Sequence, residues 1–335
     1  MVSQRVLNLN RLGLVLVVFV VVLGAYTRLV DAGLGCPDWP GCYGHLKWPD
    51  TTEEVERAEK LFPEFPVDHA KTWPEMVHRY FAGVLLLVVL ALTVIAWRDN
   101  PPNKIREIST ALLILIICQA AFGAWTVTLK LWPQIVTLHL MGGFATFSLL
   151  WVLYLRQGGG RPLWLAQAQQ LNLRRHAQVA LALVIAQIVL GGWVASNYAA
   201  LACADFPTCY GSYAPPMDFA AGFNIFQHVG PNYLGGLLDN EARIAIHWTH
   251  RLGALLVMVA VAALAFRLWS TNRFLATLTF TLLAFQLMLG ILNVVWSLPL
   301  GIATAHNAFG ALLLLAMVTV NFAPAADAAD MQARN

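Results

Sequence analysis

Eight long apolar runs, spread along the whole chain, restrict this sequence to a fold that spans a membrane. A helix needs about 20 apolar residues to cross the hydrocarbon core of a bilayer, and the runs are close to that length. Only 12% of the 335 residues are charged, whereas a soluble domain averages about 25%. The expected spans are residues 12–30, 75–97, 109–129, 136–155, 177–197, 244–266, 274–296 and 301–322.

Lipid decides the secondary structure of these runs. Every backbone N–H and C=O group inside the hydrocarbon must be satisfied by the protein, which leaves helices and closed barrels. The runs are too continuous for the alternating pattern of barrel strands, so we expect an all-α integral membrane protein with eight transmembrane helices. The first run, Leu12 to Leu29, is too long for the apolar core of a signal peptide and is expected to be a retained helix.

Lysine and arginine residues gather in every second connection between the spans. By the positive-inside tendency, these connections and both termini are expected in the cytoplasm. The two long loops, residues 31–72 and 198–242, then face the periplasm if the host is a Gram-negative bacterium and the membrane is its inner membrane. The basic residues are Arg98, Lys104, Arg106, Arg156, Arg161, Arg174, Arg175, Arg267 and Arg273, with Arg5, Arg11 and Arg334 near the termini.

The net charge of +3 indicates little about macromolecular partners. The sequence has no basic run and no basic patch interleaved with aromatic residues, so nucleic acid is not an expected partner. Membrane lipid is the expected surrounding, and the oligomeric state is left open, a homo-oligomer included.

An internal repeat divides the chain into two halves. The segment LGAYTRLVDAGLGCPDWPGCYG from Leu23 resembles LGGWVASNYAALACADFPTCYG from Leu190, at an offset of 167 residues. A second match pairs MVHRYFAGVLLL from Met76 with WTHRLGALLVMV from Trp248, at an offset of 172. Four crossings return the chain to its starting side, so both halves share one topology. We expect two pseudo-symmetric four-helix bundles, residues 1–160 and 161–335.

Four histidines lie inside the expected spans at positions that the repeat relates: His78 and His139 in the first half, His250 and His306 in the second. An ionisable ring within a membrane is costly and indicates a function more often than simple packing. Two neutral imidazoles that face each other across a gap match the two axial positions of an iron porphyrin. We therefore expect each pair to bind one haem iron near the outer face of the membrane.

Zinc or copper is the competing metal. Either ion favours three or four converging donors, whereas each half offers two histidines and no intramembrane cluster of cysteines or carboxylates. Small residues one turn after the histidines would leave room for a porphyrin plane, although close packing of helices explains any one of them equally well. These residues are Ala82, Gly143, Ala254 and Gly310.

Three arginines lie near the outer ends of the spans. Arg79 and Arg251 directly follow histidines, and Arg28 closes the first span. A guanidinium group pairs well with a carboxylate such as a haem propionate. An arginine at a helix end also extends to water without any ligand, so both interpretations are open.

The repeat matches Glu75 in the first half with His247 in the second. Glu75 precedes His78 by three residues, so both lie on one helix face and the carboxylate is expected beside a haem bound there. An acidic residue at a helix N-terminus is also favoured by the helix dipole. Glu75 is our candidate catalytic residue, and His247 is a candidate secondary ligand, haem-edge contact or interfacial side chain.

The two outer loops carry cysteine pairs with equal spacing. Cys36 and Cys42 flank five residues in the first loop, and Cys203 and Cys209 flank five in the second. Such pairs in outward-facing loops predict two short disulfide loops in an oxidising compartment. A structural crosslink and a redox-active pair are both compatible with this spacing.

Together these residues resemble the haem A synthase family, membrane enzymes that convert haem O to haem A for cytochrome oxidase. The resemblance extends from Gly24 to Gly310. It rests on Thr27-Arg28 with Gly33-Leu34, Asp38-Trp39 between the first cysteines, Glu75 with His78-Arg79, His139, His250-Arg251, and His306-Asn307.

The resemblance implies a division of labour. The second half would carry a permanent haem b between His250 and His306, and the first would hold the substrate haem O between His78 and His139, with Glu75 matching an essential acid. The implied oxidoreductase reaction converts a porphyrin methyl group to a formyl group by hydroxylation-type steps. Haem O synthase is the implied donor of substrate, and the cytochrome oxidase assembly machinery is the implied partner downstream.

Two other classes of protein compete with this interpretation. A two-haem b-type electron carrier linked to quinol would keep all four histidines and would not need Glu75. A transporter built on repeats is expected to show broken helices or charges near the membrane midplane, and the eight spans contain neither feature.

Overall fold

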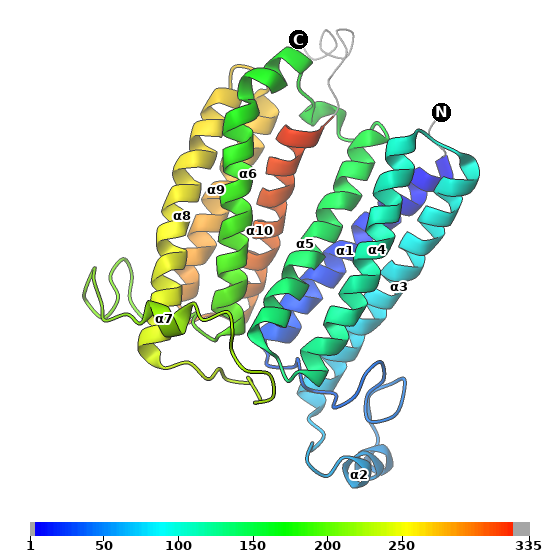
Figure 1. Cartoon of the computed structure of the whole chain (residues 1–335), viewed down its shortest axis with the longest axis vertical. Coiled ribbons are helices and arrows are strands. Elements are labelled where there is room, and N and C mark those ends of the chain that lie inside the picture. Colours follow the sequence, from blue (N-terminus) through cyan, green and yellow to red (C-terminus); the bar gives the residue numbers. More distant parts are fainter. Residues whose placement is uncertain (1–3, 324–335) are drawn as a thin grey trace.

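The computed structural model describes residues 4–323 and consists of helices joined by loops (Figure 1). Eight helices are long and apolar enough to cross a membrane, which confirms the predicted number and order of spans. Arg334 and its neighbours lie outside the described residues. The spanning helices are α1 (Gln4–Leu29), α3 (His69–Asp99), α4 (Asn103–Thr128), α5 (Pro133–Arg156), α6 (Gln167–Ser196), α8 (Asn240–Leu268), α9 (Arg273–Val295) and α10 (Leu300–Phe322).

The long helices form two groups of four that stand side by side (Figure 1). In the first group α1 packs on α3 and α5, and α4 packs between α3 and α5. The second group repeats this order, with α6 on α8 and α10 and with α9 between them. The groups meet through α5 and α10, which also contact α6 and α1. A pseudo-symmetry axis between the halves stays a prediction.

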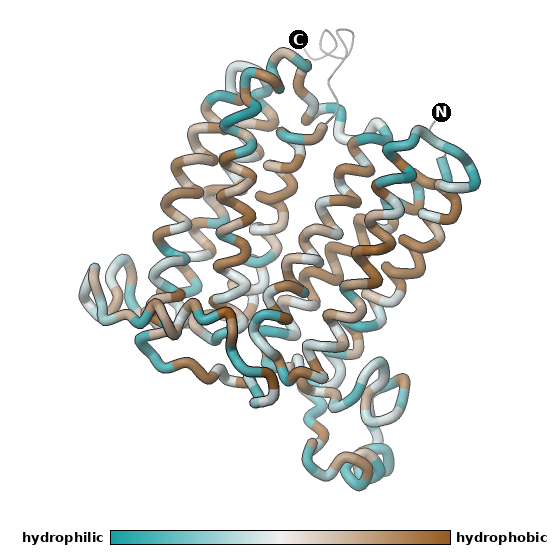
Figure 2. Tube along the Cα trace, in the orientation of Figure 1, coloured by the Kyte–Doolittle hydropathy of each residue, from teal (hydrophilic) through white to brown (hydrophobic). Residues whose placement is uncertain are grey.

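Apolar residues follow the middle of the long helices, and polar residues gather at their ends and in the loops (Figure 2). The side chains of Leu112, Leu150 and Leu264 are fully buried within the bundles. On the outer faces, Phe266 is 83% exposed and Leu256 is 61% exposed. A continuous apolar surface of this kind is suited to lipid and would be a liability in water.

All eight spanning helices begin earlier than the apolar runs predict, and α3 and α6 show the reason. Helix α3 starts at His69 rather than near residue 75. Asp68 caps this start, because its carboxylate accepts a hydrogen bond from the N–H of Ala70 at 3.0 Å. Helix α6 starts at Gln167 rather than near residue 177. Their first turns are polar, so a search for apolar runs cannot detect them. His78 therefore lies about two turns inside α3 instead of within its first turns.

The outer loops contain two helices that the apolar runs did not predict, α2 (Thr52–Leu61) and the short α7 (Phe219–Gly222). Helix α2 begins with a capping box: the Thr51 hydroxyl accepts the N–H of Glu54 at 3.3 Å, and the Glu54 carboxylate accepts the N–H of Thr51 at 3.2 Å. Both helices lie at the end of the molecule that carries the long loops (Figure 1). A helix outside lipid is specified by caps and periodicity.

A 3₁₀ turn, η1 (Arg161–Leu163), opens the connection between the two halves. The amide of Asn272, at the start of α9, donates to the carbonyl oxygens of Pro162 at 2.9 Å and Trp164 at 3.2 Å. The connection is thereby attached to the second half, and the boundary near residue 160 stays a prediction.

Candidate functional site

The first histidine of each half lies against a glycine of a neighbouring helix. A Cβ atom added to Gly24 of α1 would stand 3.0 Å from Cε1 of His78 in α3. A Cβ atom added to Gly191 of α6 would stand 3.2 Å from Cε1 of His250 in α8. The missing side chains therefore leave the space in which the two imidazole rings lie.

The second histidine of each half repeats this arrangement. A Cβ atom on Gly123 of α4 would stand 3.4 Å from Cε1 of His139, and one on Gly290 of α9 would stand 3.1 Å from Cε1 of His306. Sequence reasoning selected the small residues that follow the histidines and missed these facing glycines. The signal that identifies them is the offset of 167 residues, which relates Gly123 to Gly290 just as it relates the outer loops.

The two histidines of each half lie on different helices of one four-helix group, His78 on α3 and His139 on α5, and His250 on α8 and His306 on α10. The Nδ1 atoms of His78, His139 and His306 are buried and have no hydrogen-bond partner within residues 4–323. Buried nitrogens without partners cost free energy. Paired imidazoles in spaces that glycines leave open fit the axial ligation of a haem in each half.

A tetrahedral metal site has less support. Within the described part of the chain, no three His, Cys, Asp or Glu side chains converge in a group that could hold a metal ion. Zinc and copper sites use three or more such donors. The donor set in each half is the histidine pair, which suits a flat ligand with two axial positions.

Glu75 is 4% exposed and lies where α3 meets the first outer loop. Its Oε2 atom accepts the backbone N–H of Cys36 at 2.9 Å. Its Oε1 atom accepts a hydrogen bond from the guanidinium group of Arg79, one turn further along α3. Both carboxylate oxygens are therefore engaged, and the acid is fixed beside the helix turn that carries His78.

His247 has the same two kinds of partner in the second half. Its Nε2 atom accepts a hydrogen bond from Nε of Arg251 at 3.1 Å, and its Nδ1 atom lies 3.4 Å from the backbone nitrogen of Cys203. The residue is 5% exposed. The match that the repeat predicted between Glu75 and His247 thus holds at the level of their contacts.

Both predicted disulfides are present. Cys36 bonds to Cys42 and Cys203 bonds to Cys209, each with a Cα–Cα distance of 4.8 Å. We call these segments, residues 36–45 and 203–212, the first and second hairpins. In each hairpin the second cysteine pairs with the residue three positions later, which is His45 or Ser212.

An aspartate organises the turn of each hairpin. Asp38 accepts the N–H groups of Tyr43 at 2.6 Å and Gly44 at 2.8 Å. Asp205 accepts those of Tyr210 at 2.6 Å and Gly211 at 2.9 Å. The hydrogen bond from the Thr208 hydroxyl, together with these N–H groups, lowers the pKa of Asp205 to about 2.

Arg79 and Arg251 attach the hairpins to the helices. Arg79 donates to the carbonyl oxygens of Asp38 at 3.0 Å and Pro40 at 3.3 Å, and to that of Gly41. Arg251 likewise donates to carbonyl oxygens of the second hairpin, at 2.8 to 2.9 Å. The structure therefore shows these guanidinium groups bound to protein oxygens, and their predicted contact with propionates stays a prediction.

Arg28 links the two halves at their outer ends. Its guanidinium group donates to the carbonyl oxygen of Ala195 in α6 and forms an ion pair with Asp31 at 3.3 Å. It also stacks over the ring of Tyr198, 4.0 Å from the centroid, and the Tyr198 hydroxyl donates to Asp31 at 2.9 Å. Arg28 thus joins the end of α1 to the end of α6, and its predicted haem contact stays a prediction.

The sequence pattern of the COX15-CtaA family, described as cytochrome oxidase assembly protein, matches residues 9–318. The chain belongs to this family. The match includes all four histidines, Glu75 and both hairpins. Membership in the COX15-CtaA family agrees with the resemblance that the residues themselves predicted.

Three individual proteins with similar sequences are all named heme A synthase. A protein of Shewanella oneidensis called heme A synthase is 46% identical over 316 residues, which cover 94% of this chain and 95% of the relative. A heme A synthase of a Caulobacter species is 28% identical over 91% of both chains. One from Halalkalibacterium halodurans is 28% identical over 70% of this chain and 72% of the relative.

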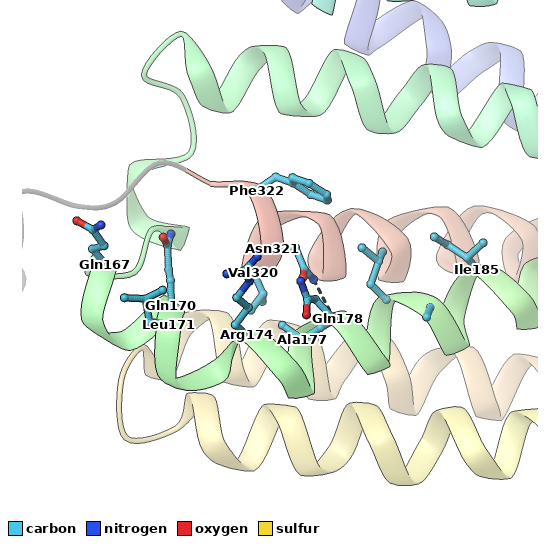
Figure 3. A pocket seen from close by; sticks show the side chains of 12 residues that line it. Gln167, Gln170, Leu171, Arg174, Ala177, Gln178, Ile185, Val320, Asn321 and Phe322 are labelled. Atoms are coloured by element: carbon cyan, nitrogen blue, oxygen red, sulfur yellow. Dashed lines mark hydrogen bonds between the residues drawn. The ribbon is translucent and has the colours of Figure 1, made fainter. Parts of the chain in front are cut away.

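A groove between α6 and α10 lies away from the four buried histidines and Glu75 (Figure 3). Its volume is about 510 Å³, and its polar wall includes Gln170, Arg174 and Asn321. It occupies the first turns of α6 and the last of α10, whereas Gly191 and His306 lie toward the opposite ends of these helices. None of the four histidines lines it, and we assign it no part in the chemistry.

Proposed function

We propose that this chain is a haem A synthase, an oxidoreductase that oxidises one methyl group of haem O to the formyl group of haem A. The COX15-CtaA family and the names of its relatives support this proposal. The observation that carries it is the difference between two otherwise matched sites. Glu75 and His247 receive the same contacts from the first cysteine and from the arginine of their halves, so one site has an acid where the other has an imidazole.

The first half is the proposed site of the reaction. His78 and His139 are its proposed axial ligands to the substrate iron, and the facing glycines leave room for their rings. Glu75, one turn before His78, is the proposed catalytic residue. A carboxylate that the protein holds in place can accept a proton or stabilise positive charge that develops at the reacting methyl carbon.

The second half is the proposed site of a haem b, with His250 and His306 as its axial ligands. Because this half has no carboxylate at the place of Glu75, a haem held there would supply electron transfer rather than undergo oxidation. His247, which stands in place of the acid, accepts a hydrogen bond from Arg251, whose guanidinium group also binds carbonyl oxygens of the second hairpin.

We place the protein in the inner membrane of a bacterium, with the termini and arginine-rich connections in the cytoplasm. The positive-inside tendency supports this orientation. The two disulfides support it independently, because such bonds persist in an oxidising compartment such as the periplasm. Both proposed haem sites then lie near the periplasmic face, with haem O synthase as donor and the oxidase assembly machinery as the partner downstream.

The proposal is tested by supplying haem O to the wild-type protein and to Glu75→Gln in a host that makes no haem A of its own. We expect haem A in the wild-type extract, and haem O or a hydroxylated intermediate in the variant. Because a positioned acid or base typically contributes at least about a hundredfold to the rate, we expect the rate of haem A formation to fall by that factor or more in the variant. Haem b alone in both proteins, with both sites filled, would indicate an electron-transfer cytochrome instead.

A further inference from the structure

Among the four buried histidines, His250 has a polar side chain beside its Nδ1 atom. The side-chain nitrogen of Gln187, in α6, lies 3.0 Å from Nδ1 of His250 and donates to the backbone carbonyl oxygen of His250 at 2.9 Å. His250 is the one member of the set whose Nδ1 atom is not buried without a partner in residues 4–323. Gln187 therefore holds both the ring and the main chain of a single proposed haem ligand.

The space for this amide comes from a glycine. A Cβ atom on Gly253 of α8 would stand 2.2 Å from Oε1 of Gln187. Any larger residue at position 253 would force the amide away from its present place. Gln187 and Gly253 are thus one arrangement, made by two helices.

The first half replaces both members of this arrangement. The offset of 167 relates Gln187 to Val20, and the offset of 172 relates Gly253 to Phe81. Phe81 stacks on Phe19 with ring centroids 5.4 Å apart, so apolar side chains occupy this part of the first half. His78 is left with a buried Nδ1 atom that has no hydrogen-bond partner within the described residues.

A second pair of glutamines lies near the other histidine of each half. Gln119 and Gln286 are related by the offset of 167 and occur in both. The side-chain nitrogen of Gln286 lies 3.4 Å from Nε2 of His306. Gln119 lies against Gly142, three residues after His139, much as Gln187 lies against Gly253, but Nδ1 of His139 still has no hydrogen-bond partner within residues 4–323. What distinguishes Gln187 is therefore its contact with a histidine Nδ1 atom.

We propose that Gln187 is a positioning residue for His250, and that it makes the second half hold its haem more firmly than the first. The inference rests on the haem sites of the proposed function. A resident haem then exchanges slowly in the second half, while a haem in the first half can be released as product. Partners of this kind, which orient a metal-binding histidine, typically change metal affinity by about 10-fold to 100-fold.

An amide suits both neutral tautomers of the ring, because it has one donor group and one acceptor group. In the present geometry the amide nitrogen faces Nδ1. When Nε2 binds a metal, Nδ1 carries the ring proton and donates it to a nearby acceptor. Oε1 of Gln187, which is buried without a partner in the described structure, is the acceptor that the site provides.

The test uses the full-length protein with His78→Ala and His139→Ala, so that only the second half keeps a histidine pair. Gln187→Val gives position 187 the residue that Val20 supplies in the first half. We expect haem to pass to apomyoglobin about ten times faster than from the parent. We also expect a higher reduction potential of the bound haem, because an imidazole that cannot share its proton donates less to iron.

Two further variants separate this role from a general loss of packing. Gly253→Ala should mimic Gln187→Val, because its Cβ atom displaces the amide. Gln187→Glu keeps an acceptor, so it should restore slow haem loss and shift the potential below that of the parent. The matched control is Gln178→Val, on the exposed part of α6, which should change neither quantity.

The outcomes distinguish this inference from the proposed function. If Gln187→Val matches Gln178→Val in both haem loss and potential, Gln187 has no positioning role. If His250→Ala in the same parent still binds haem with two axial imidazoles, the proposed haem site itself is wrong. Loss of haem in His250→Ala together with the expected shifts in Gln187→Val supports both.

Discussion

Glu75 and His247 occupy equivalent places in the two halves, and each lies within hydrogen-bond distance of the backbone N–H of the first cysteine of a hairpin. Each also accepts a hydrogen bond from an arginine four residues later. One shared framework therefore presents a carboxylate in one half and an imidazole in the other. The proposed division of labour follows from this exchange, which lies between two hairpins of the same construction.

The two arginines should differ in their effect on stability. Arg79→Ala leaves the buried Glu75 carboxylate without its charged partner, and breaking a buried pair in this way costs about 3–5 kcal/mol. Arg251→Ala leaves a neutral imidazole and carbonyl oxygens, a loss of about 1–3 kcal/mol. Thermal unfolding of both variants in the same detergent measures the difference. An equal or larger loss in Arg251→Ala would contradict the ion pair that we assign to Glu75.

Gly24→Ala should impair the reaction without affecting the second half. Its Cβ atom would stand 3.0 Å from Cε1 of His78, so the ring must shift from its place. A displacement near 1 Å at a reacting site can cost about a hundredfold in rate. Gly83→Ala in α3 is the matched control, since nothing lies within 4 Å of a Cβ atom there. Equal rates of haem A formation in the two variants would show that Gly24 is not needed for His78.

The first outer loop should respond to alkaline pH through Tyr43. Burial, with the nearby charges of Glu59 and Asp38, raises the pKa of Tyr43 to about 12. The folded state thus favours the neutral phenol, and this contribution to stability is present below pH 10 and is lost as the pH rises through about 12. The difference in ultraviolet absorbance between wild type and Tyr43→Phe should show one phenol ionising near pH 12. Ionisation near pH 10 would contradict the buried position.

Tyr198→Phe should weaken the contact between the halves by a small amount. The variant keeps the ring that stacks on Arg28 and removes the hydroxyl that donates to Asp31 at 2.9 Å. The loss of one such hydrogen bond costs about 1 kcal/mol. Arg28→Ala should cost more, because it also removes the contact with the carbonyl oxygen of Ala195. A comparison of unfolding temperatures tests this order.

The spans and the histidine pairs could be predicted because lipid imposes simple requirements. Apolar length identifies a crossing, and a titratable ring inside it is conspicuous. Helix α2 and the polar start of α3 lie outside the lipid, so apolar length carries no information about them. The capping box of Thr51 and Glu54 was nevertheless present in the sequence.

The contacts of the site were harder to predict. The repeat matched Glu75 with His247, but only the structure shows that both lie within hydrogen-bond distance of the first cysteine of a hairpin. The roles of Gly24 and Gln187 depend on histidines of other helices, His78 and His250. These partners are too far away in the sequence for a local pattern to reveal them. The repeat relates Gly24 to Gly191 and Gln187 to Val20. A residue-by-residue comparison of the two halves would therefore have selected these positions.

Glu75→His is the variant that tests the account most directly, since it gives the first half the residue of the second. The protein should fold and bind haem, because an imidazole at this place can accept the hydrogen bond of the arginine, as His247 does in the second half. The measurement is chromatography of the haems extracted after haem O is supplied. We predict haem O without haem A. Haem A at the wild-type level would contradict the assignment of the reaction to the acid at position 75.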